Sequence, residues 1–397
     1  MATTPPTSST SPGIRVLVVT AQLSAHSGTS KVATELVRGL RAAGCDVSTH
    51  AFSTTSDVAL LGGSEDLPPP NSRRSRVTRT LSTAFQLPLI RTVWRDGFAP
   101  EDAVDFWGAI TDSGFVLKAR RAQLVVFMNY WAALPRFRLE TTPRPRTVVY
   151  FHELPSYAEV PPGVRGFLRG LVRGLASRCD CIVSVSPRIQ AGVRNELGLE
   201  SQVLYHGIRS ISTQWAKEGF VLLDTRWTDS RQPLFALDVA AAVPETRFVM
   251  AGHFPSPSVR AGVEREIRDR GIGDRITIRT GLTETQLTEL YGRARWYLRW
   301  SAVGGEAGPS VGMFDAIAGR SVPIVDEGMG GADFLRTNQL GGLVVRRDPT
   351  EFASRLRFFQ EKPEQYTRIL ERIELVRQAN SWPAYGLRLL QLALRSG

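Results

Sequence analysis

The sequence predicts an α/β protein made of two units, each a parallel β-sheet covered by helices. Short runs of β-branched and aliphatic residues, which indicate strands buried on both faces, alternate with amphipathic helical segments along most of the chain. The alternation is interrupted by the segment RSISTQWAKEG, near residues 209–219, and then resumes. A chain of 397 residues is also long enough to bury two or three separate cores.

Composition and charge limit the classes of partner. Hydrophobic residues make up 42% of the chain and charged residues 22%, which is typical of a soluble globular protein. The formal net charge is +11, and arginine supplies nearly all of the positive charge, which favours bidentate contacts with phosphate groups. The composition therefore admits nucleic acid, an anionic membrane surface or a phosphorylated small molecule as a partner.

Three features predict the compartment. The three cysteines are too few for a disulfide framework and suit a reducing environment, where burial of Cys179 and Cys181 in a strand is favoured over a zinc site. No apolar run approaches the roughly eighteen residues that span a bilayer. The N-terminus lacks the basic start and apolar segment of a signal peptide, and its Thr, Ser and Pro content predicts a disordered tail over residues 1–12. We expect a cytoplasmic protein.

The first unit opens with a strand, a loop of small residues and a helix. Arg15 to Thr20 is the predicted strand, and the helix that follows the loop carries apolar residues at helical spacing before Asp46 to Phe52 forms the next strand. Gly28 lies at the start of this helix, where it could flank a ligand, although a plain tight turn is the alternative. The loop matches neither GxGxxG nor GxxxxGK[ST], so neither a dinucleotide fingerprint nor a nucleotide-hydrolysing loop is supported.

Residues 54–80 form a predicted loop that combines Pro, Gly and Ser with several arginines. Such a basic segment could contact an anionic acceptor or a membrane surface, or simply be solvated. Between Leu81 and Phe115 aromatic residues occur among charged ones, which suggests helices that cover a sheet or build an acceptor pocket.

Regular α/β order then resumes, and polar side chains follow the strands. Strand 147–151 ends at His152, and ligands of parallel sheets collect beyond the carboxyl ends of strands. His152 could therefore bond a ligand or shuttle a proton, with a purely structural role as the alternative. The other elements predicted here are strand 124–128, helix 164–177, strand 181–184, helix 187–197 with Ser186 as its cap, and strand 202–204.

The second unit places two arginines just beyond its first strand. Arg226 and Arg231 lie five residues apart in the loop that follows strand 220–223. Two guanidinium groups at a strand end predict a convergent clamp for an anion. The elements predicted after them are helix 233–242, strand 247–251, helix 258–270, strand 276–279, helix 284–294 and strand 296–300.

The stretch that follows the last of these strands predicts a phosphate site. A glycine-rich turn precedes a helix that opens at Pro309 or Ser310, and strand 322–325 comes after it. Such a helix N-terminus gathers unpaired backbone N–H groups and the positive end of the helix dipole, which together hold phosphate. Glu306 and Asp315 lie on either side of this point. The alternative is an ordinary strand, turn and helix with a solvated glutamate.

The C-terminal part adds a glycine-bearing loop and helices. The loop is expected at residues 326–333, and helices are expected at 348–361, 363–377 and from Ser381 onwards. The last helix carries Leu387, Leu390 and Leu394 on one face, so we expect that face to pack. No Asp-x-Asp pair occurs in the sequence, so we expect no divalent metal site.

The order of these motifs resembles glycosyltransferase family 4, over nearly the whole chain from Gly13 onwards. The segment VSVSPRIQAGVRNELGLESQVLYHGI is similar to the family's "VSP" and "NG" region, with His206 where Asn is usual. TRWTDSRQP is similar to the basic loop that opens the second domain, and LTELYGRA to the family's "LxxLYxxA". EAGPSVGMFDAIAG is similar to "EGFGxxxxEAMAxG", although eight residues rather than seven separate its two acids.

The resemblance implies the GT-B fold, with two Rossmann-like domains facing a central cleft and a C-terminal helix that crosses back to the N-terminal domain. It implies a retaining, metal-independent transfer of a sugar from a nucleoside diphosphate, with the nucleotide-sugar as substrate and no separate cofactor. Glu306 would contact the donor sugar, and a second acid would hold the ribose. Either Asp315 takes that position after a one-residue insertion, which we favour, or Phe314 does.

The predicted site then has two groups of residues. The catalytic set is His152, Glu306, Arg226 and Arg231, and the donor-binding set is Arg226, Arg231, Gly308, Pro309, Ser310, Val311, Asp315 and Gly28. The predicted domains are a tail at 1–12, an N-terminal acceptor domain at 13–208 joined by helix 383–397, a linker at 209–219 and a donor domain at 220–382.

Other functions stay open on the sequence alone. A sugar-nucleotide epimerase or hydrolase with the same fold would carry the same motifs, and the irregular acid spacing admits an impaired member that serves as a partner subunit. The acceptor could be a small molecule or a lipid-linked glycan, and peripheral contact with an anionic membrane at its inner face stays open. Nucleic acid is not expected, because the arginines are spread over loops and helices and no nucleic-acid-binding module is present.

Overall fold

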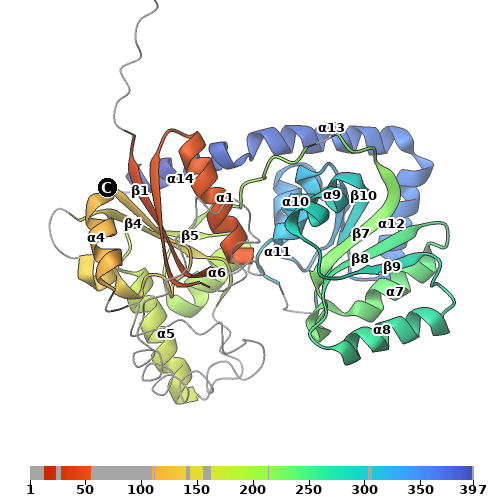
Figure 1. Ribbon diagram of the computed structural model, residues 1–397, viewed down its shortest axis with the longest axis horizontal. Helices are drawn as coiled ribbons and strands as arrows, with labels where there is room; N and C mark the ends of the chain where they lie inside the picture. Colours follow the sequence, from red (N-terminus) through yellow and green to blue (C-terminus); the bar gives the residue numbers. More distant parts are fainter. Residues whose placement is uncertain are drawn as a thin grey trace, which may run out of the picture.

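The protein has two lobes that lie side by side, each built around its own parallel sheet (Figure 1). The computed structural model describes residues 13–23, 28–54, 110, 112–139, 144–154, 162–212, 214–302 and 306–395. The predictions for residues 1–12, for the basic loop, for most of the aromatic segment and for Gly304 and Gly305 lie outside these residues. Among the described residues, no helix is both long and apolar enough to cross a membrane.

The N-terminal sheet has the strand order β2-β1-β3-β4-β5-β6, with all strands parallel. Its strands are β1 (Arg15–Leu23), β2 (Asp46–Thr54), β3 (Leu124–Phe127), β4 (Arg146–Phe151), β5 (Cys181–Ser184) and β6 (Gln202–Val203). The helices of this lobe are α1 (Gly28–Ala42), α4 (Ser113–Arg121), α5 (Pro162–Ala176) and α6 (Pro187–Gly192), with short helical turns η4 (Leu134–Leu139) and η5 (Val193–Leu197). All four residues of β3 are buried, as predicted for a strand covered on both faces.

The C-terminal sheet has the order β12-β11-β10-β7-β8-β9, again all parallel. Its strands are β7 (Glu218–Arg226), β8 (Arg247–His253), β9 (Ile276–Arg279), β10 (Ala294–Arg299), β11 (Val322–Asp326) and β12 (Val344–Val345). The surrounding helices are α7 (Pro233–Ala242), α8 (Pro257–Asp269), α9 (Glu284–Arg293), α10 (Val311–Ala318), α11 (Gly330–Thr337), α12 (Pro349–Glu361) and α13 (Pro363–Ala379), with η6 (Asp229–Arg231) and η7 (Gly341–Leu343).

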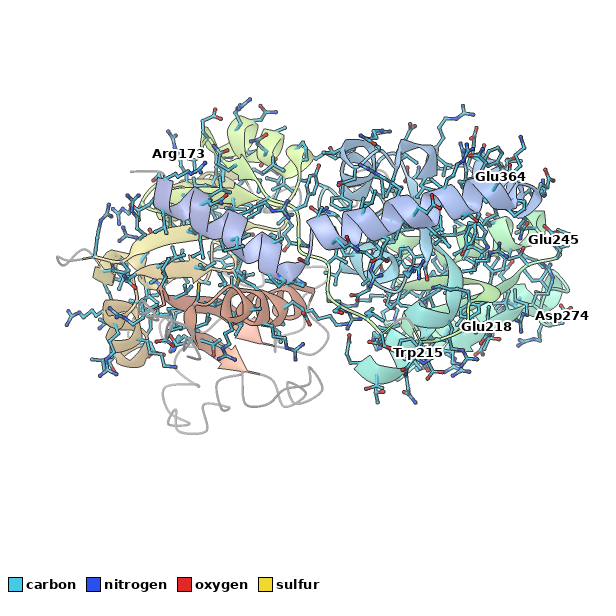
Figure 2. The ribbon with its side chains drawn as sticks, turned by 90° about the horizontal axis from the view of Figure 1, so that it is seen from above. Arg173, Trp215, Glu218, Glu245, Asp274 and Glu364 are labelled. Atoms are coloured by element: carbon cyan, nitrogen blue, oxygen red, sulfur yellow. The ribbon has the colours of Figure 1, made fainter. Side chains whose placement is uncertain are left out.

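The last helix, α14 (Trp382–Arg395), returns to the N-terminal lobe and packs beside α1 (Figure 2). Tyr385 of α14 donates a 2.7 Å hydrogen bond from its hydroxyl to that of Tyr150 in β4, and both side chains are fully buried. The chain passes between the lobes twice, and the two connecting segments are hydrogen-bonded to each other. The Ile208 N–H donates to the Asn380 carbonyl at 2.7 Å. The predicted architecture of two parallel-sheet domains with a returning helix is therefore confirmed.

Several local predictions need correction. Helix α10 begins at Val311 with Ser310 as its N-cap, so Pro309 precedes the helix and is not its first residue. In α14 Leu390 is buried, but Leu387 and Leu394 are 49% and 45% exposed, because the helix turns a face centred on Tyr385 and Leu389 to the core. The predicted loop 326–333 is a loop only to Met329, since α11 begins at Gly330.

The sequence order of the strands reverses at one place in each sheet. In the N-terminal sheet this place lies between β1 and β3, and in the C-terminal sheet between β7 and β10. Connections leave such a switch point in opposite directions, which opens a crevice beyond the carboxyl ends of the two strands. The two switch points are therefore the positions at which each sheet can offer a ligand site.

Candidate functional site

A cluster of two arginines and one glutamate lies at the switch point of the C-terminal sheet. Arg231, in η6 after β7, donates from Nη1 to Glu306 Oε2 at 2.8 Å. Arg299, the last residue of β10, donates from Nη2 to both carboxylate oxygens of Glu306, at 3.2 and 3.3 Å. We call Arg231, Arg299 and Glu306 the Glu306 cluster. It brings together residues from three segments at one edge of the sheet.

The cluster holds more positive than negative charge in a largely buried place. The side chains of Arg231, Arg299 and Glu306 are 20%, 10% and 17% exposed. Burial lowers the pKa of Arg231, and the neighbouring Arg299 guanidinium lowers it further. Burial also acts to lower the pKa of Arg299, but Glu306, Tyr297 and Asp224 together more than offset this effect and raise it. One carboxylate thus serves two guanidinium groups, and an additional anion would complete the neutralisation.

The loop from Glu306 to Ser310 joins this cluster to the N-terminal lobe. A Cβ on Gly308 would lie 2.7 Å from the carbonyl oxygen of His152, so only glycine allows this approach. Ser186 also donates from Oγ to the Ala307 carbonyl at 2.8 Å. At the end of the loop, Ser310 Oγ accepts from the Met313 N–H at 3.1 Å and caps α10.

The N-termini of two helices from different lobes meet beside this loop. A Cβ on Gly28, the first residue of α1, would lie 3.5 Å from Cγ2 of Val311, the first residue of α10. Each helix N-terminus carries unpaired N–H groups and a positive dipole end. Their meeting therefore adds to the positive potential at the interface between the lobes.

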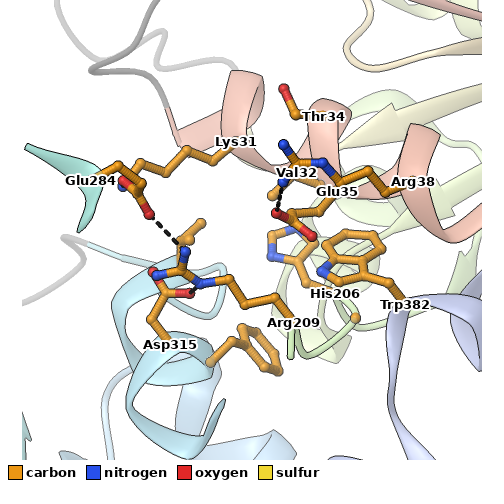
Figure 3. A pocket seen from close by; sticks show the side chains of 13 residues that line it. Lys31, Val32, Thr34, Glu35, Arg38, His206, Arg209, Glu284, Asp315 and Trp382 are labelled. Carbon is orange, nitrogen blue, oxygen red and sulfur yellow. Dashed lines mark hydrogen bonds and ion pairs between the residues drawn. The ribbon is translucent and has the colours of Figure 1, made fainter. Parts of the chain in front are cut away.

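Asp315 belongs to a second group of charges, which lines a pocket (Figure 3). Arg209, in the segment between the sheets, donates from Nε to Asp315 Oδ1 at 2.5 Å and from Nη1 to Glu284 Oε1 at 2.7 Å. Lys31 of α1 pairs with the other oxygen of Glu284 at 2.8 Å. Burial raises the pKa of Asp315 to about 6, although the Arg209 charge opposes this shift.

The pocket lies between elements of both lobes. Its lining residues are Lys31, Val32, Thr34, Glu35, Arg38, His206, Gly207, Arg209, Glu284, Val311, Phe314, Asp315 and Trp382. Asp315 contributes its carboxylate, whereas the neighbouring Phe314 is 3% exposed and packs its ring on Phe334 at 4.9 Å between centroids. The acid of this helix that forms polar contacts at the pocket is therefore Asp315.

Two histidines lie together at the edge of the N-terminal sheet. His152 Nδ1 and His206 Nε2 are 3.1 Å apart, and the His152 ring stacks on Tyr150 at 5.6 Å between centroids. Burial lowers the pKa of His152 to about 4. Burial also lowers the pKa of His206, and the His152 ring lowers it further. Both imidazoles are therefore neutral at pH 7.

A further arginine, Arg188, connects the two lobes through residues outside the Glu306 cluster and the pocket. Arg188 of α6 donates to the carbonyls of Glu327 and Gly328 at 2.7 and 2.8 Å, and from Nε to Asp333 Oδ2 at 3.1 Å. The three acceptors lie in and after the loop that follows β11. This contact, which the sequence did not predict, fixes the edge of the C-terminal sheet against the N-terminal lobe.

The predicted residues are thus only partly brought together. Arg231 meets Glu306, Gly308 meets His152, and Gly28 meets Val311. Arg226, in contrast, is exposed at the end of β7, and its side chain forms no hydrogen bond or ion pair with any of the described residues. Its place in an anion clamp stays a prediction.

Arg299 and Arg209 are site residues that were not predicted from the sequence. Arg299 could have been found, because a charged residue at the buried end of a strand must have a partner. Within the described parts of the chain, no group of three or more His, Cys, Asp or Glu side chains could hold a metal ion.

Comparisons with known proteins identify a matching family model and structures of similar fold. Residues 26–210 match the model of Glycosyltransferase Family 4. The chain is similar in structure to HepE from Anabaena in complex with UDP and glucose, with a TM-score of 0.69, 12% identity and coverage of 97% of this chain and 100% of that one. No curated protein sequence matches the chain.

Two further solved structures are similar. Sucrose-phosphate synthase from Thermosynechococcus elongatus has a TM-score of 0.65, 14% identity and coverage of 96% and 98%. A glycosyltransferase from Rickettsia africae has a TM-score of 0.64, 13% identity and coverage of 97% and 98%. At these identities the likeness establishes the fold of the chain.

Proposed function

We propose that the chain, which has the GT-B fold and matches the Glycosyltransferase Family 4 model over residues 26–210, is a glycosyltransferase that moves a sugar from a nucleoside diphosphate to an acceptor with retention of configuration. The structure of HepE holds UDP and glucose, and an α-glucosyltransferase of the same fold is complexed with UDP-glucose. These complexes support a nucleoside diphosphate sugar as the donor.

The Glu306 cluster is the observation that carries this proposal. When the sugar leaves, negative charge grows on the diphosphate, and the reaction is accelerated by positive groups that are already in place. Arg231 and Arg299 are held by burial and by Glu306, so they need little rearrangement to receive that charge. The N-terminus of α10 adds its dipole. These groups support a transfer that needs no metal ion, and activity retained in EDTA would test that step.

In the proposed function the two lobes bind different parts of the substrates. The C-terminal lobe holds the donor through Arg231, the turn from Gly308 to Val311, and Asp315 for the ribose. Glu306 contacts the hydroxyls of the donor sugar, His152 faces that sugar from the N-terminal lobe, and the Gly28 end of α1 flanks the acceptor. The acceptor is a small molecule or a lipid-linked glycan in the cytoplasm, the latter with peripheral contact at an anionic membrane.

A donor screen followed by product analysis tests the proposal. A ligand that binds only the folded state raises the unfolding temperature, so UDP-, GDP-, ADP- and dTDP-sugars can be ranked by thermal shift. The best donor is then incubated with and without candidate acceptors, and the anomeric configuration of the product is read by NMR. Free sugar or an epimerised donor without an acceptor would point to the hydrolase or epimerase alternative. Binding without any turnover would point to an impaired partner subunit.

The substitution Glu306→Gln sharpens this test. It keeps the size of the side chain but removes the charge that holds Arg231 and Arg299 together, so we expect transfer to fall about 10- to 100-fold. Donor hydrolysis measured beside transfer shows whether the sugar is still handled correctly. Wild-type rates of both reactions in the variant would contradict the role given to Glu306.

A further inference from the structure

His206 lies between the pocket and His152, where no motif assigned it a role. It lines the pocket (Figure 3), is 5% exposed, and turns Nε2 toward His152 Nδ1 at 3.1 Å. His206 Nδ1 and His152 Nε2 are buried without a well-formed hydrogen bond among the described residues, although the backbone of Met128 hydrogen-bonds the His152 ring closely enough to raise its pKa. A buried polar atom without a partner costs free energy, so this arrangement is expected to serve a ligand.

We infer that His206 is a positioning residue for His152, fixing the ring plane and the tautomer of that histidine for the transfer reaction. The inference rests on the proposed function, in which His152 faces the donor sugar. It adds to that function a residue that holds the buried His152 imidazole in the orientation and tautomer that the reaction requires.

The contact couples the hydrogen positions of the two rings. A neutral imidazole carries one hydrogen, and two ring nitrogens 3.1 Å apart can share only one hydrogen between them. If His206 Nε2 donates, His152 carries its own hydrogen on Nε2, whereas if His152 Nδ1 donates, its Nε2 is a bare acceptor. The state of His206 therefore determines whether His152 offers a donor or an acceptor to a sugar hydroxyl.

The surroundings hold both rings in place from either side. The His152 ring stacks on Tyr150, whose hydroxyl accepts a hydrogen bond from the hydroxyl of Tyr385 in α14. His206 packs against Phe314 of α10 at 5.7 Å between centroids. The pair thus extends from the core of the N-terminal lobe to the helix of the C-terminal lobe that carries Asp315.

The charges near the pair come from several elements. The titratable groups next to His152 along the chain are Tyr150 of β4 and Glu153. The charged side chains that line the pocket with His206 are Lys31, Glu35 and Arg38 from α1, Arg209 from the intervening segment, Glu284 from α9 and Asp315 from α10. Most of these are already paired with one another. Burial lowers the pKa of both rings, the His152 ring lowers the pKa of His206 further, and a backbone hydrogen bond with Met128 only partly opposes the shift of His152, so both rings are neutral at pH 7.

Three substitutions of His206 test the inference. Glutamine places an amide group near the position of the imidazole Nε2 and cannot titrate, asparagine is too short to reach it, and alanine removes the polar group. We expect His206→Asn and His206→Ala to lower kcat about 10- to 100-fold with little change in the donor KM, because His152 loses its orientation. His206→Gln should restore kcat to within about threefold of the wild type.

Two readouts separate positioning from a loss of structure. The ¹⁵N chemical shifts of His152 report its tautomer without any turnover, and should change in His206→Ala but not in His206→Gln. The pKa of His152 should rise toward its ordinary value in His206→Ala, because water enters the space left, so activity should be lost at a higher pH on acidification. Circular dichroism and the unfolding temperature check that each variant is folded.

The outcomes distinguish this inference from the proposed function. If the His152 tautomer, its pKa and kcat are all unchanged in His206→Ala, the inference is overturned. If His152→Ala keeps full activity while the shifts still respond to His206, the role of His152 in the proposed function fails, but the coupling of the two rings stands.

Discussion

The switch points of the two sheets have the same topology and different chemistry. In the C-terminal sheet, Arg231 follows β7, Arg299 ends β10, and both converge on Glu306. In the N-terminal sheet, the described residues beyond β3 are neutral and already engaged. Asn129 Oδ1 accepts from the Ala132 N–H at 2.8 Å, and Tyr130 stacks on Phe151 at 5.4 Å between centroids. The crevice is thus set by strand order, whereas its ligand is set by the side chains.

The difference suits a reaction between two unlike substrates. In the proposed function the donor carries a diphosphate that gains charge as it leaves, and the buried arginines of one switch point would stabilise that charge. A sugar hydroxyl needs hydrogen-bonding groups and no net charge, which the neutral histidine pair at the edge of the other sheet can provide. If this interpretation is right, changes at the edge of the C-terminal sheet affect the donor, and the following predictions test this.

The largest effect is expected from Arg231→Ala. It removes a charge-assisted contact that strengthens as the diphosphate departs, so we expect kcat/KM for the donor to fall about 10²- to 10³-fold. Arg231→Lys is the matched control, and it should recover part of the loss because it keeps the charge but not the planar fork. Steady-state kinetics measure both. An unchanged kcat/KM for the donor in Arg231→Ala would mean that Arg231 does not bind the departing diphosphate.

An intermediate effect is expected from Arg188→Ala, which removes contacts between the N-terminal and C-terminal lobes. Arg188 joins α6 to the loop after β11 through two carbonyls and Asp333. Without it the lobes must be brought together at donor binding, so we expect the donor KM to rise about tenfold with a small change in unfolding temperature. Arg194→Ala is the control, because its ion pair with Glu200 is exposed and lies within one lobe. A similar KM for both variants would show that the contact does not assist closure.

The smallest effect is a pH dependence of stability that arises from Asp315. Burial raises its pKa from 3.8 to about 6, so the folded protein binds a proton between these values that the unfolded chain does not bind. The folded state therefore gains stability as pH falls from 6 toward 3.8. Asp315→Asn cannot titrate, so the free energy of unfolding of the wild type minus that of the variant should increase on acidification. Urea unfolding at pH 7, 6 and 5 measures it, and a constant difference would contradict the buried, titrating Asp315.

Much of the fold could be predicted because it depends on local patterns. Strand β9 and helix α7 have the bounds that the sequence predicted, since flanking turns and Pro233 punctuate them clearly. Helix α11 was missed because Gly330 and Gly331 suggested a loop. The structure shows why glycine occurs there, since a Cβ on Gly330 would lie 2.0 Å from the Ala307 carbonyl. Its glycines allow close packing rather than a turn.

The candidate site was less predictable. Arg231 and Glu306 were named from their positions beside strands. The end of a buried strand indicates that Arg299 needs a partner, but no local pattern indicates that the partner is Glu306 or that Arg226 is exposed. The histidine pair joins residues 54 apart in the chain, and the Arg188 contact with Asp333 joins residues 145 apart. Sequence spacing carries no information about such pairs.

The sequence by itself determined the α/β order, the strand ends that carry polar residues and the cap of α10, because hydrophobic periodicity and capping depend on neighbours within a few residues. Only the tertiary structure decided which of these side chains meet. That choice depends on the order of strands in each sheet and on how two separately built lobes pack, with burial forcing each charged or polar group to find a partner.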